Sequence, residues 1–272
     1  MYGQTVKAFT VKKYGDMYRF CVYNPIEKYI PSEVDNLYLQ EINFRPWEGV
    51  SFADDEYFEI KKNIKLECNL VRAKSRVIEL GLCNDWDWFG TFTIDKKKYD
   101  RYDLKNYYKA FSNFIRNYRT RSGKDIKYLI IPEMHQDGAW HAHGLIKGLA
   151  IGEDLKSDGL PCKLQKMGFY NWLPYMARFG WCSFSPIKLK ERVAFYITKY
   201  LYKGMAERIN DYDGHLFYAS KGLNSAEVLQ RGELYQGDLR GYPMISNDWC
   251  SWVTMDRQDF ENDIFLQKIL NQ

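Results

Sequence analysis

The sequence lacks the cysteine and hydrophobic patterns that mark several large protein classes. Its six cysteines are scattered and form no C-x-x-C pair. This argues against a zinc ribbon or a disulfide-rich scaffold and favours a reducing, cytoplasmic setting. No apolar run approaches the roughly 18 residues that a membrane-spanning helix needs. The first ten residues also lack the apolar core of a signal peptide. We therefore expect a cytoplasmic protein with no membrane association.

The chain also lacks the G-x-x-x-x-G-K-[ST] pattern, in which a glycine-rich loop cradles the phosphates of a nucleotide. We therefore expect neither a nucleotide cofactor nor a P-loop helicase domain. Internal repeats and low-complexity linkers are absent as well. The 272 residues, 46% hydrophobic and 17% aromatic, provide enough apolar material for one large domain with terminal elaborations.

The excess of positive charge is small, because 39 lysines and arginines face 35 aspartates and glutamates. Basic residues are nevertheless clustered, as in the group Arg72, Lys74 and Arg76. A single cluster is equally well explained by a solvated helix face. Several clusters around one site would instead form an electrostatic track for a phosphate backbone. We therefore take Arg72, Lys74 and Arg76, together with Lys203, as candidate nucleic-acid contacts.

Alternating strand and helix patterns predict the fold class. The expected elements are a helix at 60–82, a strand at 85–95, a helix from the N-cap Asp103 to Gly123, strands at 124–135 and 139–149, a helix at 165–178, a strand at 181–187, a helix at 188–208, a strand at 215–223 and a helix at 256–270. Gly81 is expected to help end the first helix. This order predicts an antiparallel sheet packed on helices, an α+β fold.

Three of the four histidines lie within nine residues, in the segment PEMHQDGAWHAHG at 132–144. An Asp-Gly pair between two strand patterns is a strong hairpin signal. Side chains alternate between the two faces of a strand, so His141 and His143 share a face.

The length of the hairpin loop decides whether Glu133 joins these histidines. A two-residue loop would leave Glu133 on the opposite face, whereas a three-residue loop, 136–138, would place it beside His141. The three-residue loop puts a glycine in the left-handed position of a G1 bulge, so we favour it. The residues that then line one face are Glu133, His135, His141 and His143.

Two imidazoles and a carboxylate from adjacent strands form a set of three ligands with open positions. Such a set suits a divalent ion such as Mg²⁺ or Mn²⁺ and is typical of catalytic sites. We therefore interpret Glu133, His141 and His143 as metal ligands. His135 is a fourth ligand, a partner that supports a ligand from behind, or an exposed neighbour. The alternative for the whole group, exposed histidines on an edge hairpin, explains a single histidine better than H-x-H with a facing glutamate.

A second segment, FYITKYLYKG at 195–204, contains Y-x-x-K twice: Tyr196 with Lys199, and Tyr200 with Lys203. By itself it is best explained by an amphipathic helix with core aromatics and snorkelling lysines. Beside a metal site the segment suggests chemistry. Tyrosine is a poor nucleophile because its pKa is about 10, but a nearby ammonium and a metal-bound phosphate would both help it attack. The product would be a covalent phosphotyrosine.

These residues together resemble the HUH endonucleases, and within them the rolling-circle replication initiators of plasmids and phages. The resemblance is greatest to those of mobile elements in Gram-positive bacteria. Three motifs occur in that family's order: WFGTFTID at 88–95, HAH at 141–143 with Glu133 eight residues ahead, and the Y-x-x-K of Tyr196 and Lys199. Relaxases place the tyrosine first, so the order is that of replication initiators. Two departures from the family's pattern, Gly90 and Ala142, replace larger residues without removing a ligand.

The resemblance implies a five-stranded antiparallel sheet of RNA-recognition-like topology with N- and C-terminal elaborations. It implies nicking of one DNA strand at an origin, which leaves a 5′-phosphotyrosine and a free 3′-OH that primes synthesis. By motif, Glu133, His141 and His143 are the metal ligands, Tyr196 the nucleophile and Lys199 a positioning cation. Tyr200 has the spacing of the second tyrosine that phage-type members use.

The expected parts of the chain are 1–82, an N-terminal arm and basic helix; 83–225, the catalytic nickase domain; and 226–272, a C-terminal extension. The expected partners are single-stranded or melted origin DNA and, because no helicase motif is present, a host helicase and polymerase.

Three other functions are compatible with parts of this pattern. A transposase of the HUH type would use the same chemistry on the ends of an element. A metal-dependent hydrolase would use an activated water, and its activity would survive Tyr196→Phe. A non-catalytic DNA-binding module would keep its DNA affinity without the metal and without Tyr196.

Overall fold

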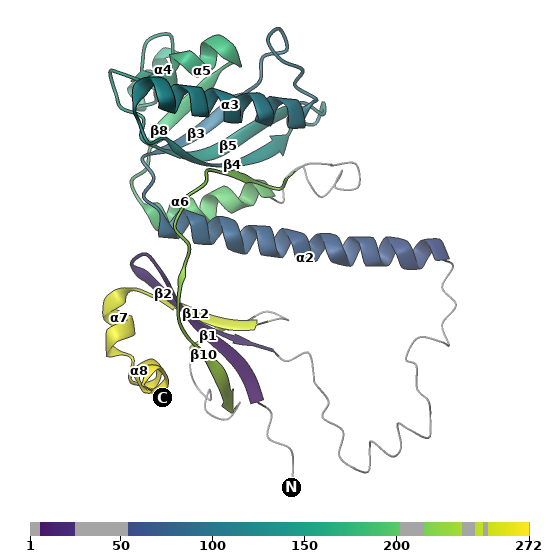
Figure 1. Cartoon of the computed structure of the whole chain (residues 1–272), viewed down its shortest axis with the longest axis vertical. Helices are drawn as coiled ribbons and strands as arrows, with labels where there is room; N and C mark the ends of the chain where they lie inside the picture. Colours follow the sequence, from purple (N-terminus) through teal and green to yellow (C-terminus); the bar gives the residue numbers. More distant parts are fainter. Residues whose placement is uncertain (1–5, 25–53, 202–214, 236–242, 247–249, 272) are drawn as a thin grey trace. The chain divides into compact units, whose positions relative to one another are not determined.

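The computed structural model describes residues 6–24, 54–201, 215–235, 243–246 and 250–271 (Figure 1). The chain divides into two compact units. One unit is continuous, Leu66–Ala226, and the other combines the two ends of the chain, Met1–Lys65 and Glu227–Gln272. We expected the two ends to form separate parts of the protein, whereas strands from both ends lie in one sheet.

The continuous unit is built on an antiparallel sheet of five strands in the order β8-β3-β5-β4-β9. Its strands are β3 (Trp88–Thr93), β4 (Lys127–Met134), β5 (Trp140–Lys147), β8 (Cys182–Pro186) and β9 (Tyr218–Ala219). Its helices are the C-terminal part of α2 (Asp54–Cys83), α3 (Leu104–Ser122), α4 (Cys162–Lys166), α5 (Leu173–Arg178), α6 (Lys190–Tyr196) and the 3₁₀ helix η1 (Ile197–Leu201), and a small ribbon pairs β6 (Leu155–Lys156) with β7 (Asn171–Trp172). The expected α+β class with a five-stranded antiparallel sheet is confirmed.

Helices cover both faces of this sheet (Figure 1). On one face α3 and α5 pack over a core rich in aromatic rings, which includes Phe92, Phe111 and Tyr175. On the other face the C-terminal half of α2 and η1 pack over Leu129 and Leu145. The alternation of strand side chains separates the two cores, so every second residue of β4 and β5 faces the α6 side. The candidate site residues lie on that side.

The caps of α3 agree with the sequence prediction. The Asp103 side chain accepts a hydrogen bond from the backbone N–H of Asn106 at 2.9 Å. Gly123 follows the helix with φ of 69°, and its N–H donates to the carbonyl of Arg119. A left-handed residue at this position is a common helix stop that glycine adopts without strain.

Several other sequence predictions were wrong in detail. The helix expected at 165–178 is two short helices, α4 and α5, separated by β7. The strand expected at 215–223 is only the two-residue β9. The helix expected at 256–270 is interrupted at Asp263, whose side chain caps the second half by accepting a bond from the N–H of Leu266 at 2.9 Å. The helix expected at 188–208 ends at Tyr196 and continues as η1, and 202–208 lie outside the described residues.

Gly81 has a different role from the expected one. It does not end α2, which continues to Cys83. A Cβ at Gly81 would lie 2.7 Å from the Cβ of Ala194 in α6 and 3.1 Å from its Cα. Such a distance is shorter than any ordinary carbon–carbon contact, so glycine here permits close approach of α2 to α6. Helix α6 ends at Tyr196, and this contact therefore fixes the position of the tyrosine segment.

The second unit contains its own five-stranded sheet, in the order β10-β1-β2-β12-β11. Its elements are β1 (Val6–Tyr14), β2 (Met17–Tyr23), β10 (Glu227–Tyr235), β11 (Ile245–Ser246), β12 (Cys250–Met255), α7 (Arg257–Asn262) and α8 (Ile264–Leu270). A separate core forms around Phe20, Phe260 and Leu266. Across the described residues of both units, no helix is long and apolar enough to cross a membrane.

Candidate metal and tyrosine site

The hairpin between β4 and β5 has the three-residue loop that places Glu133 beside His141. Glu133 and His141 are directly paired in the register of the two strands. The N–H of His135 donates to the carbonyl of Ala139 at 2.8 Å, which closes the loop. Gly138 has φ of 83°, a left-handed conformation that glycine adopts at little cost. The predicted register is confirmed.

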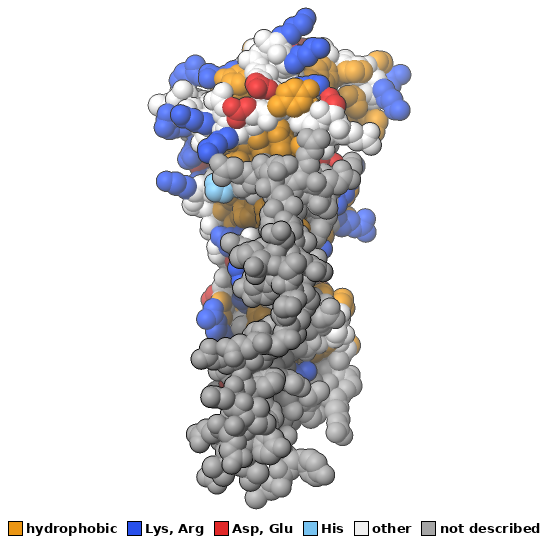
Figure 2. Space-filling model, turned by 90° about the vertical axis from the view of Figure 1, so that its right-hand side faces the viewer, with side chains coloured by type: hydrophobic (Ala, Val, Ile, Leu, Met, Phe, Trp, Pro, Cys, Tyr) orange, Lys and Arg blue, Asp and Glu red, His pale blue; other side chains and the backbone are white. Residues whose placement is uncertain are grey.

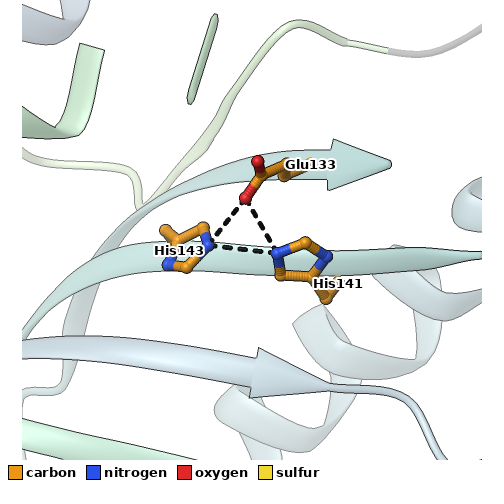
Figure 3. A group of neighbouring side chains, drawn as sticks. All are labelled: Glu133, His141 and His143. Carbon is orange, nitrogen blue, oxygen red and sulfur yellow. Dashed lines mark hydrogen bonds and ion pairs between the residues drawn. The ribbon is translucent and has the colours of Figure 1, made fainter. Parts of the chain in front are cut away.

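Glu133, His141 and His143 form a compact group on the α6 side of the sheet, which we call the ligand group. All three are buried. Oε2 of Glu133 lies 2.8 Å from Nε2 of His141 and 2.9 Å from Nε2 of His143, and the two Nε2 atoms are 3.1 Å apart. Figure 3 shows the glutamate reaching from β4 toward the two imidazoles, which both come from β5.

The spacing and chemistry of the ligand group fit a divalent cation. Adjacent ligands at about 2.1 Å from an octahedral ion lie about 3.0 Å apart, and the three measured separations are 2.8, 2.9 and 3.1 Å. Two imidazole nitrogens and one carboxylate oxygen are a donor set that divalent metals accept. The group could therefore hold a metal ion.

Thr91 of β3 orients one of these imidazoles. Its Oγ1 lies 3.2 Å from Nδ1 of His143, and the two residues are paired across β3 and β5. When Nδ1–H donates to Thr91, the lone pair of Nε2 points to the ligand group. Burial, and after it the neighbouring His141, lowers the pKa of His143 to about 4. The imidazole is therefore neutral at neutral pH, which is the form that binds a metal.

His135 lies next to the ligand group but is not part of it. Its ring stacks on that of His141 with centroids 3.9 Å apart, and it is exposed on the outer side. Only Glu133, His141 and His143 bring ligand atoms together among the described residues. Of the three roles considered for His135, the stacking agrees best with a neighbour that restrains the orientation of His141.

The tyrosine segment changes helix type at the residue of interest. Helix α6 ends at Tyr196, and the tighter η1 begins at Ile197. In a 3₁₀ helix, side chains three apart lie nearly above one another. This brings the ammonium of Lys199 over the ring of Tyr196, 3.7 Å from its centroid, where Nζ also donates a hydrogen bond to the phenol oxygen. The Y-x-x-K pattern is therefore a direct contact.

Tyr200 joins the tyrosine segment to the ligand group. Its ring lies parallel to the imidazole of His143 with centroids 3.7 Å apart. Its hydroxyl lies 3.2 Å from the hydroxyl of Tyr196. Tyr200 is buried, at 6% exposure, whereas Tyr196 is 47% exposed. The two tyrosines therefore have different surroundings, although they lie on one helical segment.

The surroundings also shift the acidity of the two phenols in opposite directions. The hydrogen bond from Lys199, and then the one with Tyr200, lowers the pKa of Tyr196 below its usual value. Burial, and then the contact with Tyr196, raises the pKa of Tyr200. Tyr196 is therefore the phenol that loses its proton more readily and the one that a large substrate can reach.

The candidate nucleic-acid contacts on α2 are not brought into the ligand group. Arg76 forms an ion pair with Glu79 at 2.9 Å and donates to Ser225 at 3.0 Å. Arg72 is exposed and Lys74 half-buried on the same helix, and their role stays a prediction. Lys203 lies outside the described residues. On the face drawn in Figure 2, the described surface of the continuous unit carries more lysine and arginine than acidic side chains.

Two neighbours of the site were not singled out from the sequence, although both lie in the motif at 88–95. One is Thr91, which bonds His143. The other is Phe89, whose ring lies 5.6 Å from that of Tyr196 and 6.0 Å from that of His143. Phe89 and Thr91 are two apart on β3 and therefore share its site face. The alternation of this strand could have identified them.

Comparison with known proteins agrees with the position of the site. No curated protein and no solved structure matches the chain. The matched family segment, 87–205, contains all three ligand residues, both tyrosines of the site and Lys199. That segment of the chain is similar to a family described as Replication-associated protein, of the ORF2 type, and the similarity supports a role in the initiation of DNA replication.

Proposed function

We propose that this chain is a rolling-circle replication initiator of the HUH type that cuts and rejoins one DNA strand through a covalent bond to Tyr196. The observation that carries the proposal is the contact chain from the ligand group to the nucleophile. His143 stacks on Tyr200 at 3.7 Å, and Tyr200 hydrogen-bonds Tyr196 at 3.2 Å. A phosphodiester held beside the ligand group would lie within reach of an exposed phenol.

In the proposed reaction the phenol oxygen of Tyr196 attacks the phosphorus of one phosphodiester. The phenol proton passes to solvent, which reaches this half-exposed side chain. A new P–O bond to tyrosine forms as the bond to the 3′-oxygen breaks, and that oxygen takes up a proton to become a free 3′-OH. The exchange conserves the number of phosphate ester bonds, so attack of a 3′-OH on the phosphotyrosine rejoins the strand. Lys199 stabilises the phenolate before attack.

Glu133, His141 and His143 would hold a divalent ion such as Mg²⁺ or Mn²⁺. When bound, such an ion is a Lewis acid toward a phosphoryl oxygen. The chain's own residues keep this group ready. Thr91 holds the tautomer of His143, and the stacked rings of His135 and Tyr200 restrain the two imidazoles. The 3′-OH that the cut releases would prime a host polymerase, and a host helicase would supply unwinding.

Labelled single-stranded oligonucleotides from the chain's own replicon test this proposal on a denaturing gel, with Mn²⁺ or with chelator. Cutting in Mn²⁺ should leave the 3′-labelled fragment covalently on the protein and release the 5′-labelled fragment. Tyr196→Phe and His141→Ala should abolish the adduct. Tyr102→Phe is the matched control, because Tyr102 is exposed to a similar extent, 56%, and lies outside the site.

Three outcomes would contradict the proposal in different ways. Cutting without an adduct in every variant would indicate a hydrolase that uses an activated water. DNA binding that survives chelation and Tyr196→Phe, without any cutting, would indicate a binding module. An adduct formed on the ends of a mobile element but not on origin DNA would indicate the transposase, which shares the same chemistry.

A further inference from the structure

A cavity of about 650 Å³ opens beside Tyr196, on the site face of the sheet. Its floor comes from the edge strand β8 and its neighbour β3. Two cross-strand pairs form it, Phe89 with Ser185 and Thr91 with Ser183. Its wall comes from α6 and the turn before it, and Tyr196 and Tyr200 line its end. The floor therefore combines an aromatic ring with three hydroxyl groups.

The position of the cavity ties its occupant to the proposed reaction. Thr91 lines the cavity and also bonds His143 of the ligand group. The cavity thus begins one strand away from the ligand group, a spacing of about 4.8 Å. Tyr196, the proposed nucleophile, lines it as well. A group that fills the cavity while a phosphate occupies the ligand group must be close to that phosphate in covalent structure.

Two cations stand at the rim without acidic partners. Lys188 and Arg192 both line the cavity and are exposed. Within the described part of the chain, neither forms an ion pair. Lys190 lies between them in sequence and differs, because it pairs with Asp85 at 3.1 Å. Unneutralised cations beside an aromatic floor favour an occupant that is anionic at its edges and planar in its middle.

We propose that this cavity holds the nucleobase adjoining the phosphodiester that is cut, and that it determines which base is accepted there. The inference rests on the proposed function and adds the recognition of the substrate to it. The base lies against Phe89, the hydroxyls of Ser183 and Ser185 hydrogen-bond its edge, and Lys188 and Arg192 contact the flanking phosphates. Aromatic stacking and edge hydrogen bonds are how proteins recognise unstacked bases.

Single-stranded DNA fits the cavity better than duplex DNA does. A base can enter only when it has left its stack, and this costs least in a strand that is already unpaired. The volume also lies in the range of about 300–1,000 Å³ that is usual for small-ligand pockets, which is large enough for one base with its sugar. The cavity therefore selects melted origin DNA.

Base preference at the cut is the measurement that tests the cavity. Oligonucleotides randomised one position at a time on either side of the cut are incubated with Mn²⁺ and with wild type, Ser183→Ala/Ser185→Ala or Phe89→Leu. Ser157→Ala is the matched control, since Ser157 lies outside the cavity. Wild type should discriminate among bases roughly 10-fold at one position next to the cut. The double serine variant should lose that preference and keep those elsewhere, and Phe89→Leu should weaken it.

The cations are tested separately. Arg192→Gln should raise KM for all sequences alike and reduce the salt dependence of binding, because it contacts phosphate rather than base. Arg116→Gln, an exposed arginine of α3 outside the cavity, is its control. A change in base preference in Arg192→Gln, without a change in salt dependence, would contradict the assignment of Arg192 to phosphate.

A binding measurement separates this proposal from the proposed function. Tyr196→Phe protein without metal is titrated with oligonucleotides that carry 2-aminopurine at successive positions. Quenching at one position, lost in the added Phe89→Leu background, supports the cavity even when nothing is cut. An adduct in wild type, with base preference unchanged in the folded serine variant, overturns the cavity and leaves the function. No adduct in wild type and no position-specific quenching overturns both. Melting temperatures identify variants that fail to fold, and single serine variants then replace the double one.

Discussion

The ring of Tyr200 lies parallel to the imidazole of His143 with 3.7 Å between their centroids. This contact joins η1 to the ligand group on β5, and it distinguishes the two tyrosines of the site. A ring stacked on His143 and 6% exposed cannot turn toward a substrate without leaving that stack. Tyr200 is therefore placed to position Tyr196 and His143.

Tyr200→Phe should keep the covalent adduct and slow its formation by roughly 10-fold. The ring and its stacking remain, but the hydroxyl that bonds Tyr196 at 3.2 Å is lost, a contribution of about 1 kcal/mol. Burst-phase kinetics of adduct formation measure the effect. If Tyr200→Phe formed the adduct at the normal rate and lost only strand joining, Tyr200 would be a second nucleophile.

Lys199→Met should shift the pH dependence of cutting to higher pH. The hydrogen bond from Lys199 is the largest cause that lowers the pKa of Tyr196. Without it that pKa rises, a smaller fraction of Tyr196 is phenolate at a given pH, and the rise of rate with pH occurs later. We expect the rate at neutral pH to fall roughly 10²-fold. Lys199→Arg keeps the charge and serves as control, and equal pH profiles for Met and wild type would refute this role.

Thr91→Val should weaken Mn²⁺ binding about 10–100-fold, the usual effect of losing the partner of a metal-ligating histidine. The variant removes the acceptor that lies 3.2 Å from Nδ1 of His143. Thr93→Val is the control, because Thr93 lies on the same strand face beside His141. Isothermal titration calorimetry compares the two, and equal affinities would contradict a positioning role for Thr91.

Gly81→Val and Gly90→Val should both destabilise the protein, by about 1–3 kcal/mol each, but with different effects on activity. A side chain at Gly81 meets Ala194 of α6, while one at Gly90 meets Phe184 at 2.7 Å on the opposite face of the sheet. Thermal unfolding measures the shared loss. Only Gly81→Val should reduce adduct formation in the folded protein, because only it displaces the tyrosine segment. Equal activities would show that α6 tolerates the shift.

Asp154→Asn should lower the free energy of unfolding by about 1–2 kcal/mol at neutral pH. Asp154 is buried; burial raises its pKa, but the bonds from Lys124, Tyr118 and the N–H of Ala150 outweigh this, so its net pKa is lowered. A lowered folded pKa stabilises the protein above the unfolded pKa of about 4, and this stability is lost as pH falls through the folded value. The difference between variant and wild type should therefore shrink below about pH 4 in denaturant titrations. A difference independent of pH would contradict the ionic role.

The sequence alone was sufficient for the parts of the site that depend on strand alternation and local turn chemistry. The loop at 136–138 set the register, because only a glycine in third position suits the bulge, and the register placed Glu133 with His141. The spacing of Tyr196 and Lys199 identified a contact on one helical turn.

Tertiary packing decided what the sequence could not. The change from α6 to η1 arises where Ile197 and Leu201 enter a core shared with β4 and α2, and no local signal marks it. Gly81 was interpreted as a helix stop because a close approach by Ala194, 113 positions later in the chain, leaves no trace in its neighbourhood. The strands β10 and β12 were missed because their partners, β1 and β2, lie at the other end of the chain.

The pairing of β1 with β10 has a consequence for how the protein is made. Phe9 must wait for Gly232, its partner in the sheet, while the whole continuous unit is synthesised. At about 5–20 residues per second, those roughly 200 residues take roughly 10–40 seconds. During that time β1 and β2 are at most a two-stranded hairpin with exposed edges, which is marginally stable. The ribosome thus releases a finished tyrosine and ligand site before the sheet at the chain's two ends can close.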